Sequence, residues 1–240
     1  MQRLRGGIYL HDGAISPADL TPDGRHVLSN DTASWHLLSM DASGAVAGCA
    51  RFLEHPDGST FDDLRVRHSA LASSAHWGSA LRSAVEKELA TASRLGFSYV
   101  EIGGWAMAPH VRGTGECLRS VLAVYAWSRL IGGAMGVSTA TERNGSASIL
   151  KRLGGRSLEW SGNAIPPYYD PRYGCQMQML RFDSRFPNPR YEEAVQDILR
   201  MLTDVPVVCG DELAPQIAPR EFRRAPQPLH AHQAAFATAV

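Results

Sequence analysis

An excess of charge of either sign is missing from this sequence. Its 240 residues carry 24 Lys and Arg against 24 Asp and Glu, so the formal net charge at pH 7 is zero. Binding to nucleic acid or to an anionic membrane surface depends on a surplus of basic residues. We therefore expect neither as a partner, and any ligand must be recognised by a local site.

Long apolar runs are missing as well. The best stretch, residues 121–135, is interrupted by Ser128, Arg129 and two glycines, whereas a membrane helix needs about 18–20 apolar residues in a row. Near the N-terminus, Arg3 and Arg5 are not followed by the apolar core of a signal peptide. We expect a soluble, cytoplasmic protein.

Cysteine and histidine patterns that hold metals are also missing. The four cysteines are scattered singly without a Cys-x-x-Cys spacing, and the nine histidines contain no His-x-x-x-His pair. Zinc sites and disulfide-rich frameworks both show characteristic spacings of these residues. We therefore expect free thiols in a reducing compartment and no metal site.

What the sequence does contain is an alternation of short strands and helices. The N-terminal third favours strands and turns rather than helices, with a hairpin over residues 34–40 and 45–54. From Ser79 to Leu95 apolar residues repeat every three or four positions, which predicts a helix. The same reasoning predicts strands over 97–107, 134–141, 157–162 and 175–182, and helices over 118–131, 144–153 and 189–203.

The length and the order of these elements fit one α/β domain over residues 1–205. Residues 206–240 are rich in proline and show no sustained hydrophobic period. Such a composition buries too little apolar surface for a second core. We therefore predict a flexible C-terminal tail over 206–240.

The segment with the most chemical information joins a strand to a helix through glycines. The chain leaves a predicted strand, passes through Arg112-Gly113-Thr114-Gly115 and enters an apolar helix. Glycines permit close approach to the backbone, and the free N–H groups and dipole of a helix N-terminus attract phosphate. Residues 111–116 are therefore predicted to bind a pyrophosphate, although a tight turn before a core helix would need the same glycines.

Two common phosphate loops are excluded by their spacing. The sequence contains no Gly-x-x-x-x-Gly-Lys-Ser/Thr motif, and no Gly-x-Gly-x-x-Gly followed at a suitable distance by an acidic ribose ligand. Neither nucleotide hydrolysis nor hydride transfer is therefore indicated.

The stretch Met107-Ala108-Pro109-x-x-Arg112-Gly113-Thr114-Gly115, with its apolar helix, resembles the acyl-CoA-binding motif of the GNAT (general N-acetyltransferase) superfamily. A second stretch, 144–155, is similar to that superfamily's Asn-initiated helix with a Leu-Gly end. The resemblance implies a mixed α/β fold with a central sheet of about seven strands and helices on both faces. It also implies that two central parallel strands splay apart, and Gly103-Gly104 is a candidate position for the bulge that opens them.

The same resemblance implies acyl-CoA as co-substrate, most directly acetyl-CoA, with its pantetheine arm between the splayed strands. The residues implied in binding it are Met107, Val111, Arg112, Gly113, Thr114, Gly115, Glu116 and Asn144. The sequence departs from the family at Cys117, where Gly or Ala is usual, and at Leu150, where many members carry a Tyr that acts as an acid.

Glu101 is the candidate general base. It lies in the otherwise apolar segment 99–102, where burial would make its carboxylate a stronger base. Its context also resembles the catalytic glutamate of the histone-acetyltransferase branch. The alternative is that Glu101 lies exposed at the start of the strand and pairs with a surface Lys or Arg.

An aromatic, proline-bounded loop is the candidate acceptor site. Tyr168, Tyr169 and Tyr173 offer rigid rings with a polar end, which suits recognition of a small ligand. The same residues could instead cap the edge of a sheet. The proton for the leaving thiolate would come from one of these tyrosines, from Cys175 or from water.

These features predict an N-acyltransferase that moves an acyl group from acyl-CoA to an amino group of a small molecule or peptide. A rival within the same fold follows from Ala50 to Glu54, which resembles the Arg-Phe strand of the N-acyl amino acid and acyl-homoserine lactone synthases. That rival would use long acyl chains on an acyl carrier protein. A second rival is a non-catalytic acyl-CoA sensor. The acceptor, the acyl length and the oligomeric state, a homodimer included, stay open.

Overall fold

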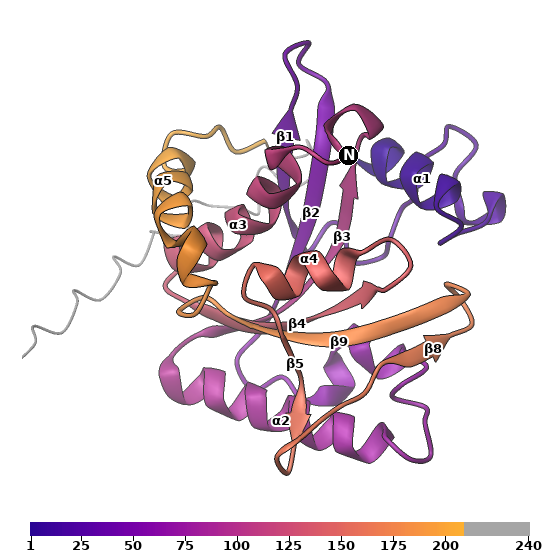
Figure 1. The fold of residues 1–240 in the computed structure, drawn as a ribbon, viewed down its shortest axis with the longest axis vertical. Coiled ribbons are helices and arrows are strands. Elements are labelled where there is room, and N and C mark those ends of the chain that lie inside the picture. The colour runs from indigo at the N-terminus through magenta and orange to yellow at the C-terminus, as the bar shows by residue number, and fades with distance from the viewer. Residues whose placement is uncertain (209–240) are drawn as a thin grey trace, which may run out of the picture.

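A mixed seven-stranded sheet organises residues 1–208, which are the residues that the computed structural model describes (Figure 1). Its order is β1-β2-β3-β4-β9-β5, and β8 pairs with β9. These strands are β1 (Trp35–Met40), β2 (Val46–His55), β3 (Ser98–Met107), β4 (Ala134–Thr141), β5 (Arg156–Ser157), β8 (Tyr168–Asp170) and β9 (Cys175–Asp183). A separate two-stranded sheet pairs β6 (Glu159–Trp160) with β7 (Asn163–Ala164).

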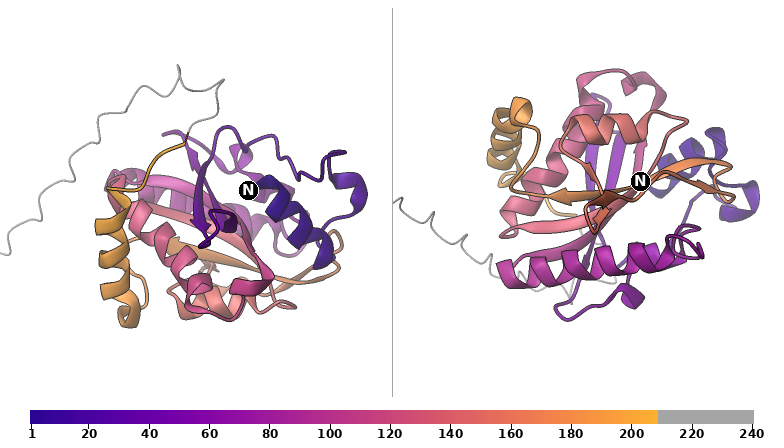
Figure 2. Two further views of the ribbon diagram at one scale, coloured as in Figure 1. Left: turned by 90° about the horizontal axis from the view of Figure 1, so that it is seen from above. Right: turned by 60° about the horizontal axis from the view of Figure 1, so that its bottom comes forward.

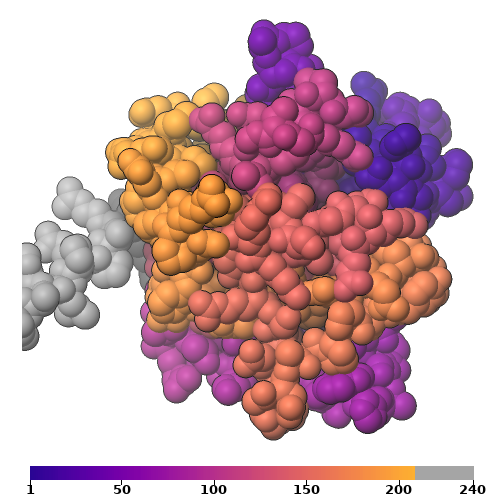
Figure 3. Space-filling view, in the orientation of Figure 1, coloured from indigo at the N-terminus to yellow at the C-terminus, as the bar shows by residue number. Residues whose placement is uncertain are grey.

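Helices cover both faces of the large sheet, which confirms the predicted fold class. The α-helices are α1 (Gln2–His11), α2 (Gly78–Leu95), α3 (Gly115–Leu130), α4 (Ser146–Arg152) and α5 (Glu192–Leu202). On one face, α2 packs through a buried cluster that includes Val85 and Met135 (Figure 2). On the other, α3, α4 and α5 pack through a cluster that includes Leu122, Leu150 and Leu180, and their surface forms the side seen in Figure 3.

The two central parallel strands pair over only four residues. Residues Ser98–Glu101 of β3 lie against Ala134–Val137 of β4. Beyond that point β3 stays paired with β2 as far as Met107, whereas β4 stays paired with β9 as far as Thr141. The two strands therefore run in different directions, with β1–β3 upright and β4 and β9 crossing below them in Figure 1. The splay that the sequence predicts is confirmed.

A bulge in β3 accompanies this divergence. The register with β2 shifts between Cys49, which faces Ala106, and Arg51, which faces Gly103. Gly104 has a φ of +63°, a conformation that side-chain-bearing residues rarely adopt. A β-bulge bends its strand and increases its twist. The irregularity predicted at Gly103-Gly104 is therefore confirmed, and it lies just beyond the last parallel pair.

The expectation of strands and turns at the N-terminus is wrong, because residues 2–11 form α1. The adjacent Gly6 and Gly7 lower helix propensity, which hid the helix. Packing compensates for that cost: Gly6 lies so close to the next loop that a Cβ would come within 2.9 Å of the Gly24 carbonyl oxygen. Ile8 is buried with Ala106 beneath the helix. Tertiary contact rather than local preference therefore specifies α1.

The continuous strand expected over residues 157–162 is also wrong. Only Arg156–Ser157 joins the large sheet, and the chain then forms the β6–β7 hairpin. Ser161 and Gly162 both have positive φ angles, 49° and 79°. Two such residues in succession form the tight turn that closes a two-residue hairpin. The turn therefore interrupts the strand.

Five short 3₁₀-helices connect these elements within residues 1–208: η1 (Pro17–Asp19), η2 (Phe61–Asp63), η3 (Arg65–His68), η4 (Pro109–Val111) and η5 (Pro189–Tyr191). No helix in the described part of the chain is both long enough and apolar enough to span a membrane. The predicted tail over 206–240 lies outside the described residues from position 209 onward.

Candidate active site

The glycine bend between β3 and α3 is open. Gly113 has a φ of +78°, and Thr114 caps α3 by accepting the Glu116 N–H at 3.2 Å. The Gly113 N–H donates to no acceptor within residues 1–208. A Cβ built on Gly113 or Gly115 would meet no atom within 4 Å. The bend therefore offers backbone donors and space at a helix N-terminus, an arrangement that attracts anions.

Arg112 at this bend is already paired. Its guanidinium forms an ion pair with Asp12, the C-cap of α1, with an Nη2–Oδ2 distance of 2.9 Å, and Nε donates to the Met107 carbonyl at 3.2 Å. Arg143, from the loop after β4, donates to the Asp12 carbonyl at 2.8 Å. Asp12, at the C-terminal end of α1, thus contacts both loops that follow the splayed strands β3 and β4. Its side-chain carboxylate offsets part of the positive charge of Arg112.

Asn144 does not cap α4. The N-cap is Gly145, with a φ of 70°, and no side chain accepts a hydrogen bond from the first turn. Asn144 lies exposed in the preceding loop. A glycine provides the left-handed conformation needed at this position, so the cap predicted at Asn144 is wrong by one residue.

Glu101 is buried at the point where β3 and β4 separate. Its residue exposure is 7%, so the alternative of an exposed strand start is wrong. The carboxylate accepts the N–H groups of Arg65 and Val66, each at 2.8 Å, and Nε2 of His55 lies 3.0 Å from Oε2. An ionised carboxylate only accepts hydrogen bonds, so with Glu101 in that form Nε2 of His55 is the donor in this contact.

These three contacts define what Glu101 can do chemically. A carboxylate has about four lone-pair positions, and the two N–H groups and His55 occupy three of them. One lone pair, on Oε1, therefore has no hydrogen-bond partner among these three groups. The side chain is thus held in one orientation and retains the capacity to accept one further hydrogen, as a general base must.

The three tyrosines predicted for the acceptor site do not gather in one place. Tyr169 is 57% exposed on β8. The ring of Tyr168 packs against the core under α2, where burial raises the pKa of its phenol. Burial also raises the pKa of Tyr173, and after burial the largest influences on it are the charges of Arg172 and Asp170. Of the three tyrosines, only Tyr169 is exposed.

Four polar residues near Glu101 were not predicted as site residues. His55 and Arg51 come from β2, Arg65 from η3, and Asn30 from the loop before β1. The Asn30 Oδ1 accepts hydrogen bonds from Arg51 Nη1 at 3.0 Å and from Arg65 Nη1 at 3.2 Å. A charged residue inside the apolar strand 48–53 was the available signal for Arg51, the same signal that singled out Glu101.

No protein-family model and no curated protein matches this chain. Solved structures do match it in fold. The CoA-dependent acyl-homoserine lactone synthase BjaI, with SAM and isopentyl-CoA, has a TM-score of 0.52 at 15% identity over 87% of this chain and 82% of that chain. The CoA-dependent acyl-homoserine lactone synthase MesI has a TM-score of 0.50 at 16% identity, covering 88% of this chain and 89% of that one. The chain has the fold of these acyl-homoserine lactone synthases.

This GNAT-like fold is the one predicted from the glycine motif. The structure also shows what surrounds Leu150, one of the two residues that depart from the family pattern. That residue is buried in α4 among the apolar side chains under α3 and α5. A leucine there cannot donate a proton. Cys117 is the other residue that departs from the motif, and its thiol donates to the Val111 carbonyl at 3.3 Å.

Within the described residues, no group of three or more His, Cys, Asp or Glu side chains could hold a metal ion.

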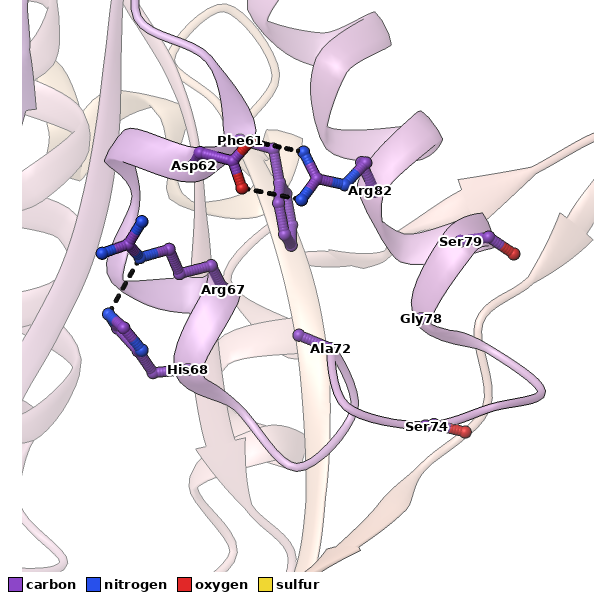
Figure 4. Close-up of a pocket in the computed structure, with 9 residues that line it drawn as sticks. All are labelled: Phe61, Asp62, Arg67, His68, Ala72, Ser74, Gly78, Ser79 and Arg82. Carbon is purple, nitrogen blue, oxygen red and sulfur yellow. Dashed lines mark hydrogen bonds and ion pairs between the residues drawn. The ribbon is translucent and has the colours of Figure 1, made fainter.

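A surface pocket of about 430 Å³ lies elsewhere, between the η2–η3 segment and the start of α2 (Figure 4). Its charged groups are occupied with one another: Arg82 forms two hydrogen bonds to Asp62, and Arg67 donates to His68. The pocket shares η3 with the Glu101 site, since Arg65 and Val66 bind the carboxylate from the same short helix. It does not open onto the splayed strands.

Proposed function

We propose that this protein is an N-acyltransferase that moves an acyl group from acyl-CoA to an amino group. The observation that carries the proposal is the separation of β3 from β4 directly after Glu101. The separation leaves one backbone edge of β3 unpaired with β4. The buried carboxylate of Glu101 lies where this unpaired stretch begins, and the open glycine bend lies where it ends. The acyl-CoA, its thioester bond and the proposed base would then all lie along β3.

Donor binding follows from the bend and the free strand edge. The diphosphate would lie on the backbone of residues 111–116, where the α3 dipole and the Gly113 N–H favour negative charge. The pantetheine arm would run beside the part of β3 from Ile102 to Met107 that leaves β4. The thioester then lies near Glu101, where the strands part. Val111, Thr114, Gly115 and Glu116 belong to this proposed donor site.

The reaction is direct attack of the amine on the thioester. A proton passes from the ammonium group of the acceptor to Oε1 of Glu101, and the neutral nitrogen attacks the carbonyl carbon. The C–N bond forms and the C–S bond breaks. The nitrogen loses its second proton, which passes through water to the CoA thiolate, and Glu101 returns the first proton to solvent. His55 and the two η3 amides hold the carboxylate in place throughout.

The donor in this proposal is acetyl-CoA. The fold shared with CoA-dependent synthases supports CoA over an acyl carrier protein as the carrier. Calorimetric titration with acetyl-CoA and release of free CoA with a panel of amines test the proposal. Absence of both binding and release would overturn it. Faster turnover with long-chain acyl carrier protein than with acetyl-CoA would favour the rival donor, and binding without release would favour a sensor.

Reversing the charge of Arg112 is expected to weaken CoA binding. An Arg112→Glu variant replaces a cation beside the bend by an anion, and loss of such a charge-assisted contact costs about tenfold in Kd. Titration calorimetry with CoA measures the effect. Arg94→Glu, an exposed charge reversal at the end of α2, is the matched control. Equal affinity for CoA in both variants would remove Arg112 from the donor site.

Neutralising Asp12 is expected to strengthen CoA binding. Asp12 competes with the donor diphosphate for Arg112, and a partly exposed ion pair is worth about 0.2–1 kcal/mol, or up to about fivefold in Kd. The Asp12→Asn variant removes this competition while keeping the backbone carbonyl that Arg143 contacts. A Kd for CoA that rises instead would show that Asp12 orders the bend rather than competing at it.

A further inference from the structure

The outer edge of β1 has no partner strand. β1 ends the order of the large sheet and pairs with β2 alone, and within residues 1–208 no other backbone group bonds to the outer edge of Trp35–Met40. Natural sheets protect such edges with charged side chains, prolines or bulges. β1 contains no Lys, Arg, Asp, Glu or Pro, and its register with β2 shifts only at the end of the strand, between Ser39 and Met40. The edge is therefore open to pairing with another strand.

Two large apolar side chains of β1 lie exposed beside this edge. Trp35 and Leu37 pack under α3 in the cluster that contains Trp127. Because successive side chains of a strand alternate between its faces, Leu38 and Met40 point the other way, where they are 45% and 55% exposed. Adjacent exposed apolar side chains at an open strand edge are typical of a protein–protein contact.

A second apolar segment approaches the same edge. Residues 203–208 leave the end of α5 and run toward β1 in Figures 1 and 2. They start from Leu202, which packs against the cluster that Trp35 and Leu37 border. Three valines of this segment are exposed: Val205, Val207 and Val208. Apolar surface therefore borders the open edge on both faces of the sheet.

The identical strand of a second copy fits this edge. The formal net charge of the chain is zero, so no long-range repulsion keeps two copies apart. Antiparallel pairing about a two-fold axis at Leu38 places Leu38 opposite its own copy and His36 opposite Met40, on the face where Leu38 and Met40 are exposed. A charged residue at this axis would face the same charge in its partner, and β1 carries none.

We propose that this chain forms a homodimer in which β1 pairs antiparallel with β1 of a second copy, so that the two sheets join into one. The dimer does not depend on the proposed acyl transfer, because β2 separates β1 from β3. A stable interface buries about 1,200–2,000 Å² in total, which is more than the edge of a short strand supplies. The exposed valines of residues 203–208 therefore contribute to the contact together with Leu38 and Met40.

Sedimentation equilibrium of the full chain tests the dimer. We expect twice the mass of one chain at high concentration and dissociation on dilution. Leu38→Lys places two like charges at the axis and is expected to raise the dimer Kd by at least about tenfold. Leu95→Lys is the matched control, because Leu95 is 41% exposed at the end of α2, away from β1 in Figure 1. A wild-type monomer at every concentration, or an equal dimer Kd in Leu38→Lys and wild type, overturns the proposal.

A charge swap tests the register. Leu38→Lys and Leu38→Glu are each expected to be monomeric with the circular dichroism of the wild type, because Leu38 is largely outside the core. Mixed in equal amounts, the two variants are expected to form a dimer, since the introduced lysine then faces the introduced glutamate. A mixture that stays monomeric while both variants are folded overturns pairing about Leu38.

Hydrogen exchange of the wild-type protein needs no variant and so does not depend on either one folding. The β1 amides that point away from β2 are expected to exchange at least about tenfold more slowly in the dimer than after dilution to the monomer. Rapid exchange of these amides in a dimer would place the contact on another surface. Slow exchange in a protein that is monomeric throughout would mean that the same chain covers the edge. Either result overturns the proposal.

Discussion

A Glu101→Gln variant is expected to lower kcat by about two to four orders of magnitude while leaving the Kd for CoA unchanged. The amide cannot take the proton of the acceptor ammonium, although it nearly preserves the size and shape of the side chain. The donor contacts proposed at residues 111–116 lie at the other end of β3 and are not altered. Steady-state kinetics with the best acceptor, together with calorimetry for CoA, measure the two quantities.

The contacts of Glu101 make a stability control necessary. A glutamine retains one acceptor oxygen, but its NH₂ group would face an η3 N–H or the protonated Nε2 of His55. An unsatisfied buried donor costs about 1–3 kcal/mol, so the variant should unfold at lower denaturant concentration. His55→Gln is the matched control, because its amide can still donate to Glu101 while the imidazole is lost.

The outcome distinguishes catalysis from sensing. We expect His55→Gln to be destabilised to a similar degree and yet to keep most of its kcat, because His55 positions the carboxylate and takes no proton from the acceptor. A folded Glu101→Gln protein with wild-type kcat would remove Glu101 from the mechanism. If neither variant nor wild type turns over any acceptor but all bind acetyl-CoA alike, the protein is a sensor.

Much of the fold could be predicted because its elements carry local signals. The helical period from Ser79 to Leu95 and the turn at 41–44 are confirmed as α2 (Gly78–Leu95) and the β1–β2 hairpin. The strand expected over 134–141 is β4 at the same residues. Where local preference and tertiary packing disagree, prediction failed. Gly6-Gly7 in α1 shows this, because only the loop packed against Gly6 explains a glycine pair inside a helix.

The candidate site was predictable only where its residues are adjacent in sequence. The glycine bend and Glu101 both belong to one continuous segment, 101–115, so motif and burial pattern could find them. Their partners come from far along the chain: Asp12 lies 100 positions from Arg112, and His55 lies 46 from Glu101. Nothing in a single sequence states which distant side chains a fold brings together. Charge inside an apolar strand, as at Arg51, is the one signal that could have been used.

The second large effect is expected at the buried ion pair that anchors α1. Arg5 is 0% exposed, and its guanidinium forms two hydrogen bonds to Asp31, one of them at 3.0 Å, and a third to the His26 carbonyl. An Asp31→Asn variant leaves a fully buried cation without its counter-charge. Loss of one partner of a buried pair costs about 3–5 kcal/mol, measured as the free energy of unfolding in urea. Asp23→Asn is the control, because Asp23 pairs with Arg3 and Arg25 at the exposed surface of the same segment and should change stability little.

Lowering the pH of the wild-type protein should weaken the same Arg5–Asp31 ion pair and so lower the free energy of unfolding. Burial alone would raise the pKa of Asp31, but hydrogen bonds from Arg5 and from the Leu28 N–H outweigh it and lower the pKa from 3.8 to about 2. A carboxyl whose pKa is lower in the folded state stabilises the fold above its unfolded pKa and loses that contribution as the pH falls. Wild-type stability should therefore drop between about pH 4 and pH 2 by more than that of Asp31→Asn. Parallel pH profiles for the two proteins would mean that Asp31 is not ionised in the fold.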